Sequence, residues 1–254
     1  SAGSAANVNS SDATLGGSLR LAVKEQVIPT ITITSPSAGA HLATSAPVIS
    51  FSMRDEVNGS GVNLSSLQIK LDGGAAIASG SNGVVVTPAI DGYDVTYTPQ
   101  SALSDGVHAV TINVSDNDGN AAEQVSRSFT TSTIAPVLNI ASPQNDSIGN
   151  SSSVTLQGVT NNAGAASPAT VSIALNGVAQ GLVPIESDGS FSLNLTLAEG
   201  ENTIVVTATD LAGNSSISTI TTTLDTSVPQ FTSVSIAPNP ANTGASVIIS
   251  IGVT

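Results

Sequence analysis

Carboxylates in close pairs are the side chains of this sequence whose type and spacing could do chemistry. The pairs are Asp55/Glu56, Asp91/Asp94, Glu186/Asp188 and Glu199/Glu201. Two neighbouring carboxylates can serve as acid and base in glycoside cleavage. Each pair lies in a predicted turn, where carboxylates are ordinarily solvated, and the chain has no Trp for a sugar platform. Nucleophile-elbow, phosphate-loop and His-Glu-x-x-His motifs are also absent, so we predict that the chain is not an enzyme.

A second acidic pattern, Asp-x-x-Gly-Asn, occurs at residues 116–120 and again at 210–214. Asp can bond to its own backbone in a turn and Gly tolerates a positive φ, so the pattern favours a tight hairpin. Asp carboxylates and Asn carbonyls are also oxygen ligands that suit Ca²⁺. The spacing differs from that of an EF-hand loop, which closes with a bidentate Glu. A structural hairpin and a calcium site therefore both stay open.

The net charge excludes several classes of partner. With 18 Asp and Glu against 5 Lys and Arg, the formal charge is -13. Nucleic acids and anionic membranes need clustered basic side chains, so neither is an expected partner. Apolar runs of about four to six residues are too short to span a bilayer, and we expect no membrane insertion. The absence of Cys excludes disulfides and thiolate metal sites.

The elements that must position these residues repeat along the chain. Three landmarks recur in the same order about 100 residues apart: segments 29–36 and 136–143, triplets 71–73 and 175–177, and segments 105–116 and 199–210. A looser third copy begins at Pro229. A repeat of this length is too long for a solenoid unit and is that of a whole β-sandwich.

Within each copy, apolar and polar residues alternate with a period of two, which places one face of a strand in a core. The expected strands are 30–34, 48–53, 67–71, 84–87, 93–98, 107–115 and 124–130 in the first copy, and 136–141, 153–159, 171–175, 181–185, 190–197, 202–209 and 217–224 in the second. We therefore predict an all-β chain of antiparallel β-sandwiches, about seven strands each, with almost no helix.

These residues resemble the bacterial immunoglobulin-like (Big-type) domains repeated in large surface and biofilm adhesins. The matching features are the opening Pro-x-Ile-x-Ile-x-Ser-Pro, the Asp/Glu-Gly lead into a long strand, the closing Asp-x-x-Gly-Asn turn and the linker 225–229. With the segment 55–73 they cover about residues 28–254. The resemblance implies tandem Ig-like sandwiches, although the Cys pair and Trp of antibody domains are missing.

The resemblance also bears on calcium. Related adhesins stiffen their rods with such ions between domains, which implies that Asp210 with Asp225, or Asp116 with Asp118, contributes ligands. Calcium is the sole cofactor that we expect.

Four further residues have two interpretations or none. His108 takes the repeat position of Asn202, which favours a hydrogen bond to a nearby turn over proton transfer. His41 has no partner that the sequence identifies. Tyr93 and Tyr97 share a strand face, which indicates either a core contact or a strip for sugar stacking.

The predicted organisation is a flexible leader at 1–27, Ig-like domains at 28–133 and 134–227, and an incomplete third domain at 228–254. The two strands expected there, 231–236 and 247–253, cannot bury a core alone. Three explanations stay open: the natural protein continues, the strands pair with the preceding domain, or another copy supplies a strand. In the third case residues 18–27, which alternate as an edge strand does, are the candidate donor.

The leading hypothesis is a non-catalytic structural or adhesive rod segment of an extracellular bacterial surface protein. Its expected partners are neighbouring Ig-like domains, copies of itself, or a surface glycan or protein receptor. A filament subunit assembled by intermolecular β-strand addition and a carbohydrate-binding accessory region of a secreted enzyme are the alternatives. We expect an extracellular or cell-surface location, with the signal peptide absent or already removed, since the chain opens at Ser1 without a signal sequence.

Overall fold

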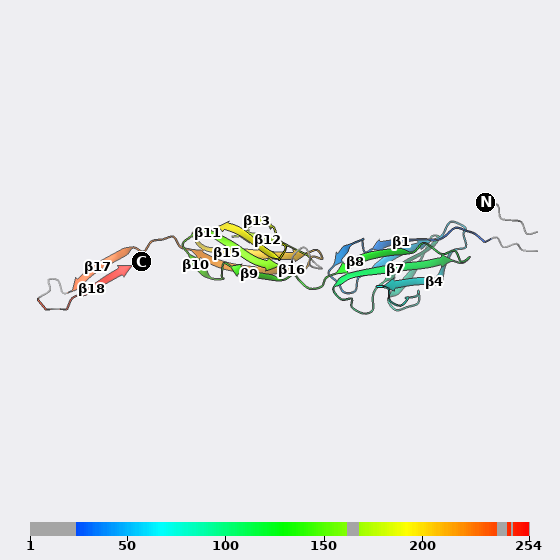
Figure 1. The fold of residues 1–254 in the computed structure, drawn as a ribbon, viewed down its shortest axis with the longest axis horizontal. Helices are drawn as coiled ribbons and strands as arrows, with labels where there is room; N and C mark the ends of the chain where they lie inside the picture. Colours follow the sequence, from blue (N-terminus) through cyan, green and yellow to red (C-terminus); the bar gives the residue numbers. More distant parts are fainter. Residues whose placement is uncertain (1–23, 162–167, 238–242, 245, 254) are drawn as a thin grey trace, which may run out of the picture.

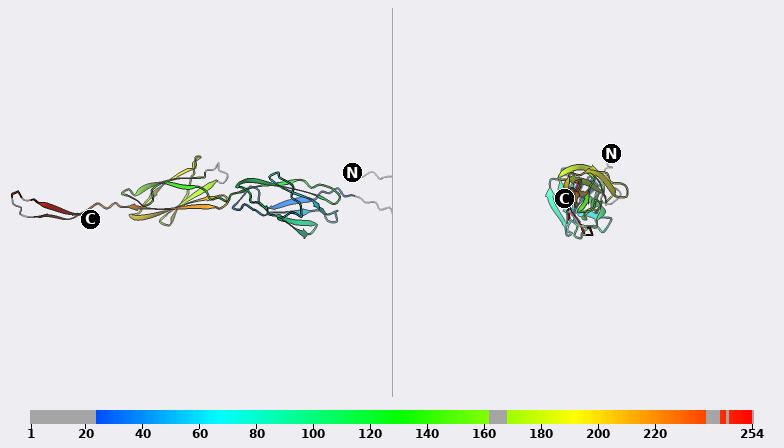
Figure 2. Two further views of the ribbon diagram at one scale, coloured as in Figure 1. Left: turned by 90° about the horizontal axis from the view of Figure 1, so that it is seen from below. Right: turned by 90° about the vertical axis from the view of Figure 1, so that its left-hand side faces the viewer.

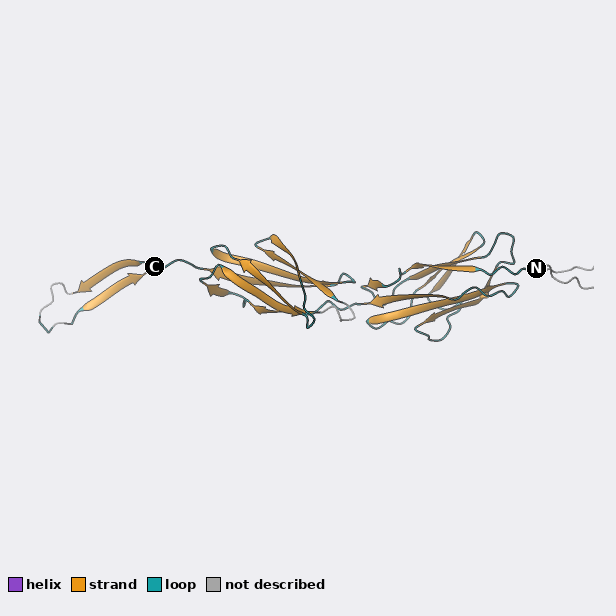
Figure 3. Ribbon diagram, turned by 45° about the horizontal axis from the view of Figure 1, so that its top comes forward, coloured by secondary structure: helices purple, strands orange, loops and turns teal. Residues whose placement is uncertain are grey.

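The computed structural model describes residues 24–161, 168–237, 243–244 and 246–253, and all regular elements within them are β-strands. The strands form two sandwiches followed by a two-stranded hairpin. Figures 1 and 3 show these three parts in a row, and the end-on view in Figure 2 shows how narrow the row is. The prediction of an all-β chain with tandem sandwiches is confirmed.

Domain 1 is a sandwich of two four-stranded sheets. Its strands are β1 (Thr30–Ser35), β2 (Ala40–Leu42), β3 (Ile49–Arg54), β4 (Val62–Leu71), β5 (Val84–Ala89), β6 (Gly92–Tyr97), β7 (Gly106–Asp116) and β8 (Val125–Thr131). The sheet orders are β1-β3-β6-β5 and β2-β8-β7-β4. Alternate residues of β7, including Val110, Ile112 and Val114, are buried against Phe51 and Phe129, so the predicted period of two is the one that builds the core.

Domain 2 repeats this plan with one strand moved. Its strands are β9 (Leu138–Ser142), β10 (Ser147–Gly149), β11 (Ser153–Thr160), β12 (Ala169–Leu175), β13 (Val178–Val183), β14 (Ser190–Thr196), β15 (Gly200–Asp210) and β16 (Ser215–Leu224). The sheet orders are β14-β11-β9 and β10-β16-β15-β12-β13. Asn176 and Gly177 form a two-residue turn with φ of 51° and 80°, and such a turn returns β13 directly onto β12. In domain 1 the longer connection 72–83 lets β5 cross to β6 in the other sheet.

Two differences from the expected strands have local causes. The three-residue strands β2 and β10 were not predicted, because three residues are too few to show a period. They pair in parallel with β8 and β16, the last strands of their domains. The strand β4 begins at Val62 instead of residue 67, since a register shift between Asn63 and Gln68 interrupts its alternation.

At the two ends the described chain has fewer partners. The strands β17 (Phe231–Ala237) and β18 (Ile248–Val253) pair with each other, and all but one of their residues are exposed. Most of the predicted leader and of the donor candidate 18–27 lies outside the described residues. Its described part, residues 24–27, is not a strand and contacts a loop of domain 1 instead. Among the described residues, no helix could cross a membrane.

Candidate functional site

The polar residues singled out in the sequence gather where linkers meet the sandwiches. We call the contact between a domain and the linker before it the upstream joint, and the contact with the linker after it the downstream joint. The turn between the last two long strands forms the upstream joint, because β7 and β15 run toward that end. The loop before β7 or β15 forms the downstream joint at the opposite end.

At the upstream joint of domain 2, Asp210 organises the turn after β15. Its Oδ1 accepts hydrogen bonds from the backbone N of Ala212 and Asn214 at 3.0 and 2.8 Å, and its Oδ2 accepts one from Asn214 Nδ2 at 2.9 Å. Asn214 Nδ2 also donates to the carbonyl O of Ser132 at 2.7 Å. The Ser132 hydroxyl donates in turn to Asp210 Oδ2 at 2.9 Å. Asp210 and Ser132 are both buried, so the turn holds the linker at Ser132 away from competing water.

The upstream joint of domain 1 repeats the bonds made by the Asn of the turn. Asp116, fully buried, accepts from Asn120 N at 2.7 Å and from Asn120 Nδ2 at 2.6 Å. Asn120 Nδ2 also donates to the carbonyl O of Glu25 at 3.2 Å, and Glu25 N donates to Asp118 Oδ2 at 3.0 Å. Burial by itself would raise the pKa of Asp116, but the hydrogen bonds from Asn120 outweigh it and the pKa lies below its usual value. The predicted hairpin is confirmed at both positions, and it also captures the preceding linker.

The downstream joints repeat as well. Asp105 accepts hydrogen bonds from Thr133 N at 2.9 Å and from Thr133 Oγ1 at 2.8 Å. Glu199 accepts from Thr226 N at 3.0 Å and from Thr226 Oγ1 at 2.8 Å. The bond from the Thr133 backbone is the main cause that lowers the pKa of Asp105. Each domain therefore binds the linker that leaves it through a carboxylate and a Thr.

Three carboxylates meet beside the upstream joint of domain 1. Glu25 comes from the linker, and Asp55 and Glu56 follow β3. Each offers a carboxylate oxygen, and these oxygens lie within 4.8 Å of one another. The neighbouring Glu25 carboxyl is the main cause that raises the pKa of Glu56 to about 7. We call this group the carboxylate cluster.

The four predicted calcium ligands are distributed differently from the expectation. Asp116 and Asp118 do share a joint, and the carboxylate of each accepts hydrogen bonds, as given above. Asp210 and Asp225 lie at opposite ends of domain 2, because Asp210 ends β15 and Asp225 follows Leu224, which pairs with the first residue of β15. The pKa of Asp225 is lowered by hydrogen bonds from Ser227. Asp210 and Asp225 of one chain therefore do not form a common site, while calcium at Asp116 and Asp118 stays a prediction.

The hydrogen bond predicted for His108 is confirmed. Its Nδ1 lies 2.7 Å from Asp72 Oδ2 and its Nε2 lies 2.8 Å from the carbonyl O of Ser104. Burial favours a lower pKa for His108, but the bonds to Asp72 and Ser104 prevail and raise it. Asn202 takes the same place in domain 2 and bonds to Asn176 and to the backbone of Ala198. In both copies this side chain therefore bonds to the loop that precedes the long strand. Tyr97 is buried in the core, and Tyr93 packs against it.

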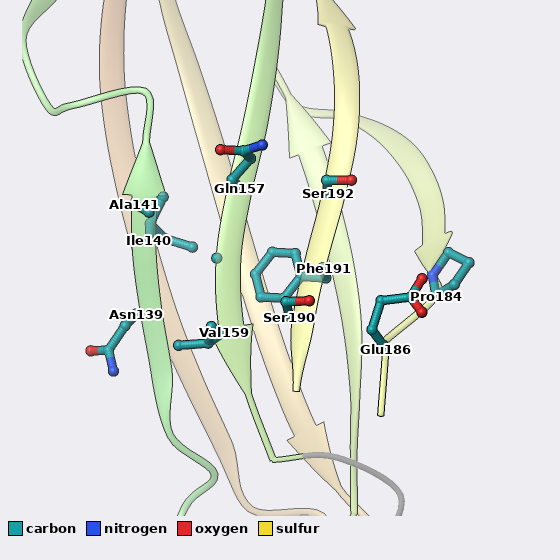
Figure 4. A pocket seen from close by; sticks show the side chains of 11 residues that line it. Asn139, Ile140, Ala141, Gln157, Val159, Pro184, Glu186, Ser190, Phe191 and Ser192 are labelled. Atoms are coloured by element: carbon teal, nitrogen blue, oxygen red, sulfur yellow. The ribbon is translucent and has the colours of Figure 1, made fainter. Parts of the chain in front are cut away.

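A cavity of about 530 Å³ opens on domain 2 between β9, β11 and β14. Figure 4 shows Phe191 reaching from β14 across to β11, with polar side chains around it. A Cβ added to Gly158 would lie 2.6 Å from Phe191 Cζ, so this glycine makes room for the ring. The ring is 3% exposed and offers no open face for a sugar to stack on.

Comparison with known proteins gives one family match. Residues 136–226, which cover domain 2, match the family model described as glucodextranase, domain B. This region is less than half of the chain. No curated protein sequence matches the chain.

Solved structures of tandem domains are similar to it. The fibronectin(III)-like modules of CbhA from Clostridium thermocellum share 14% identity at a TM-score of 0.41, with 77% of this chain and 94% of that chain covered. The structure of Rst D1-D2 shares 12% identity at a TM-score of 0.43, with 77% of this chain and 99% of that chain covered. A chimeric titin Z1Z2 tandem shares 14% identity at a TM-score of 0.31, with 77% of this chain and 100% of that chain covered. By their own strand order, both domains of this chain are Ig-like β-sandwiches.

Proposed function

We propose that this chain is a non-catalytic spacer rod from an extracellular bacterial surface protein, in which the joints hold successive Ig-like domains in line. One observation carries the proposal. Ser132 and Thr133 are adjacent in the sequence, and Ser132 is bound by Asp210 and Asn214 of domain 2, whereas Thr133 is bound by Asp105 of domain 1. Almost no free chain separates the two domains, so bending at this joint must break hydrogen bonds.

The charge and composition support the same function. The net charge of -13 makes neighbouring rods repel one another and keeps them soluble. The sandwiches contain no Cys and so do not depend on disulfides, which is compatible with an extracellular location. Surface digestion of intact source cells, followed by detection of the chain with an antibody, tests the proposed location. A chain that stays protected until the cells are lysed contradicts it.

Small-angle X-ray scattering of the full chain tests the rod. The double variant Ser132→Ala/Asn214→Ala removes three hydrogen bonds of the joint and leaves both cores intact. We expect the wild-type pair-distance distribution to show a resolved shoulder for the separation between the domains. In the variant this shoulder should broaden, because the distance between the domains then varies. Exposed Asn194→Ala is the matched control. A wild-type profile as smeared as that of the variant opposes the proposal.

A second function is favoured by the family match alone. The likeness of residues 136–226 to glucodextranase domain B supports an accessory region of a secreted carbohydrate-active enzyme. Affinity electrophoresis of the full chain in gels containing dextran tests it. Gln157 and Ser192 line the domain 2 cavity. Retardation of the wild-type chain by dextran that Gln157→Ala or Ser192→Ala abolishes supports this alternative. A mobility that dextran does not change opposes it.

The filament alternative concerns the hairpin β17–β18. Its exposed apolar residues include Val234, Ile236 and Ile249, and an added strand would cover part of this surface. The partner would be a second copy of the chain, with residues 18–27 as the donor. Electron microscopy of the chain with residues 1–27 deleted tests the donor. Filaments of unchanged length would exclude it.

A further inference from the structure

We propose that Glu25, Asp55 and Glu56 form a divalent-cation site, best suited to Ca²⁺, at the upstream joint of domain 1. Their carboxylate oxygens lie within 4.8 Å of one another, close enough to contact one ion. Oxygen-only ligands select hard cations, and side chains on a linker and a loop give the flexible geometry that Ca²⁺ accepts and Mg²⁺ does not. The site uses residues other than Asp116, Asp118, Asp210 and Asp225.

Unpartnered oxygens inside the cluster supply an independent observation. Asp55 is only 8% exposed, and its Oδ2 accepts a hydrogen bond from Gly61 N at 2.6 Å, while its Oδ1 has no hydrogen-bond partner. Glu25 Oε1 and Glu56 Oε2 are likewise buried without a hydrogen-bond partner. Buried polar atoms in proteins nearly always have one. A single cation between the three side chains would satisfy all three oxygens at once.

The backbone leaves room for the cluster at Gly59. A Cβ added there would lie 2.6 Å from Glu56 Oε1 and 2.8 Å from Glu25 Oε2. Gly59 does not have a positive φ, so the backbone conformation itself permits other residues. A side chain at this position would therefore displace the ends of the two glutamates from the place where they meet.

Domain 2 shows that the joint does not need these carboxylates. The backbone bond from Asp55 N to Asp91 O corresponds to the bond from Thr160 N to Gly189 O, so Thr160 and Asn161 stand where domain 1 has Asp55 and Glu56. Ser132 stands where domain 1 has Glu25, since each gives its carbonyl to the Asn of the turn.

The two domains thus close the same joint in different ways. In domain 2 the Ser132 hydroxyl bonds directly to Asp210. In domain 1 the joint has carboxylates in place of these neutral residues, and a cation between them would relieve the repulsion of their charges.

The basic side chains of the described part of the chain do not neutralise the cluster. The two ion pairs among the described residues, Arg54–Asp94 and His108–Asp72, do not involve the cluster. Lys24, which precedes Glu25 in the sequence, donates through Nζ to the carbonyl O of Asp118 at 2.8 Å. The bound cation would therefore supply the missing charge and tie the linker to the end of β3.

Calorimetry on the full chain, first stripped with chelator, tests the proposal. Titration with CaCl₂ alone should show binding to domain 1. At a hundredfold excess of Ca²⁺ over Kd, the Tm of domain 1 should rise by roughly 10 °C and that of domain 2 should not change. Leu156→Ala, which lowers the Tm of domain 2 alone, identifies which transition belongs to which domain.

Two variants separate a bound ion from a general charge effect. Asp55→Asn removes a ligand, and Gly59→Ala keeps all three charges but fills the space between the glutamates. Both should weaken Ca²⁺ binding at least tenfold. The control Glu186→Gln/Glu201→Gln, at exposed positions of domain 2, should bind Ca²⁺ as wild type does.

The outcomes are distinct. A domain 1 shift that Gly59→Ala abolishes supports the site, and the domain 1 transition of that variant in chelator shows that it still folds. No heat of binding, or a shift that persists in both variants, overturns the site. An equal shift with MgCl₂ overturns the assignment to Ca²⁺. The proposal does not rest on the rod function, which the scattering experiment tests separately.

Discussion

Removal of the Asp210 carboxylate should destabilise domain 2 strongly. This side chain, 6% exposed, accepts four hydrogen bonds: from the backbone N of Ala212 and Asn214, from Asn214 Nδ2 and from Ser132 Oγ. Bonds to a charged group contribute about 1.5–3 kcal/mol each, but bonds that share one acceptor are not additive. In Asp210→Ala, Asn214 Nδ2 can still donate to the carbonyl O of Ser132. We therefore expect this variant to lower the free energy of unfolding of domain 2 by about 3–5 kcal/mol.

This loss can be converted into a melting temperature. A domain of about 90 residues has an unfolding entropy near 0.19 kcal/mol/K, so 1 kcal/mol corresponds to roughly 5 °C. Asp210→Ala should therefore lower the Tm of domain 2 by about 15–25 °C in differential scanning calorimetry, while domain 1 keeps its Tm. Asp210→Asn, which retains one acceptor oxygen, should fall between this variant and wild type.

Asp188 provides the matched control. Its exposed carboxylate accepts from the backbone N and hydroxyl of Ser190, so Asp188→Ala should change the Tm of domain 2 little. If Asp210→Ala lowers the domain 2 Tm by no more than this control does, the buried Asp does not organise the turn and the reasoning is refuted.

Three more changes have outcomes that calorimetry can check. His108 has a raised pKa, so its contribution to the stability of domain 1 is present below pH 6.5 and is lost as the pH rises through the folded-state pKa. The variant His108→Asn should remove this pH-dependent loss of stability, because it gives domain 1 the residue that domain 2 has at Asn202. Gly158→Ala should cost about 1–3 kcal/mol, because its Cβ would meet the Phe191 ring. Glu56→Gln should raise the Tm of domain 1 at pH 8 in chelator, because a raised carboxyl pKa is destabilising above that pKa.

Each of these has a contrary result. If His108→Asn leaves the slope of the domain 1 Tm against pH unchanged between pH 6 and 8.5, His108 is not the cause of the pH-dependent loss of stability. Gly149→Ala meets nothing within 4 Å, so a loss equal to that of Gly158→Ala would contradict the steric argument. A lower Tm for Glu56→Gln in chelator would show that the carboxylates do not repel one another.

The strands and the two-domain plan could be predicted from the sequence because they depend on local alternation. In β7 and β15 every second residue is buried, and both strands were placed to within two residues at each end. The position of β13 was less accessible. A strand was expected at 181–185, but β13 begins at Val178, and its exposed residues hide this start from an argument based on alternation.

The site could be predicted only in part, because its partners are distant or are backbone atoms. The Asp-x-x-Gly-Asn pattern indicated a hairpin at both positions. It did not reveal that Asn120 and Asn214 also bind the linkers, since the acceptors there are carbonyl groups without a sequence signature. Glu25 lies 30 residues before Asp55 and was not singled out, and only the fold brings the two together.

The distance across the joint between domains 1 and 2 tests the central claim most directly. Because the chain has no Cys, spin labels on Thr87→Cys and Thr196→Cys report one distance by double electron–electron resonance. Both positions are exposed, one in each domain. The bound linker predicts a single narrow distribution, which broadens when Ser132 and Thr133 are both replaced by Gly. A wild-type distribution as broad as that of the Gly variant would contradict a fixed joint.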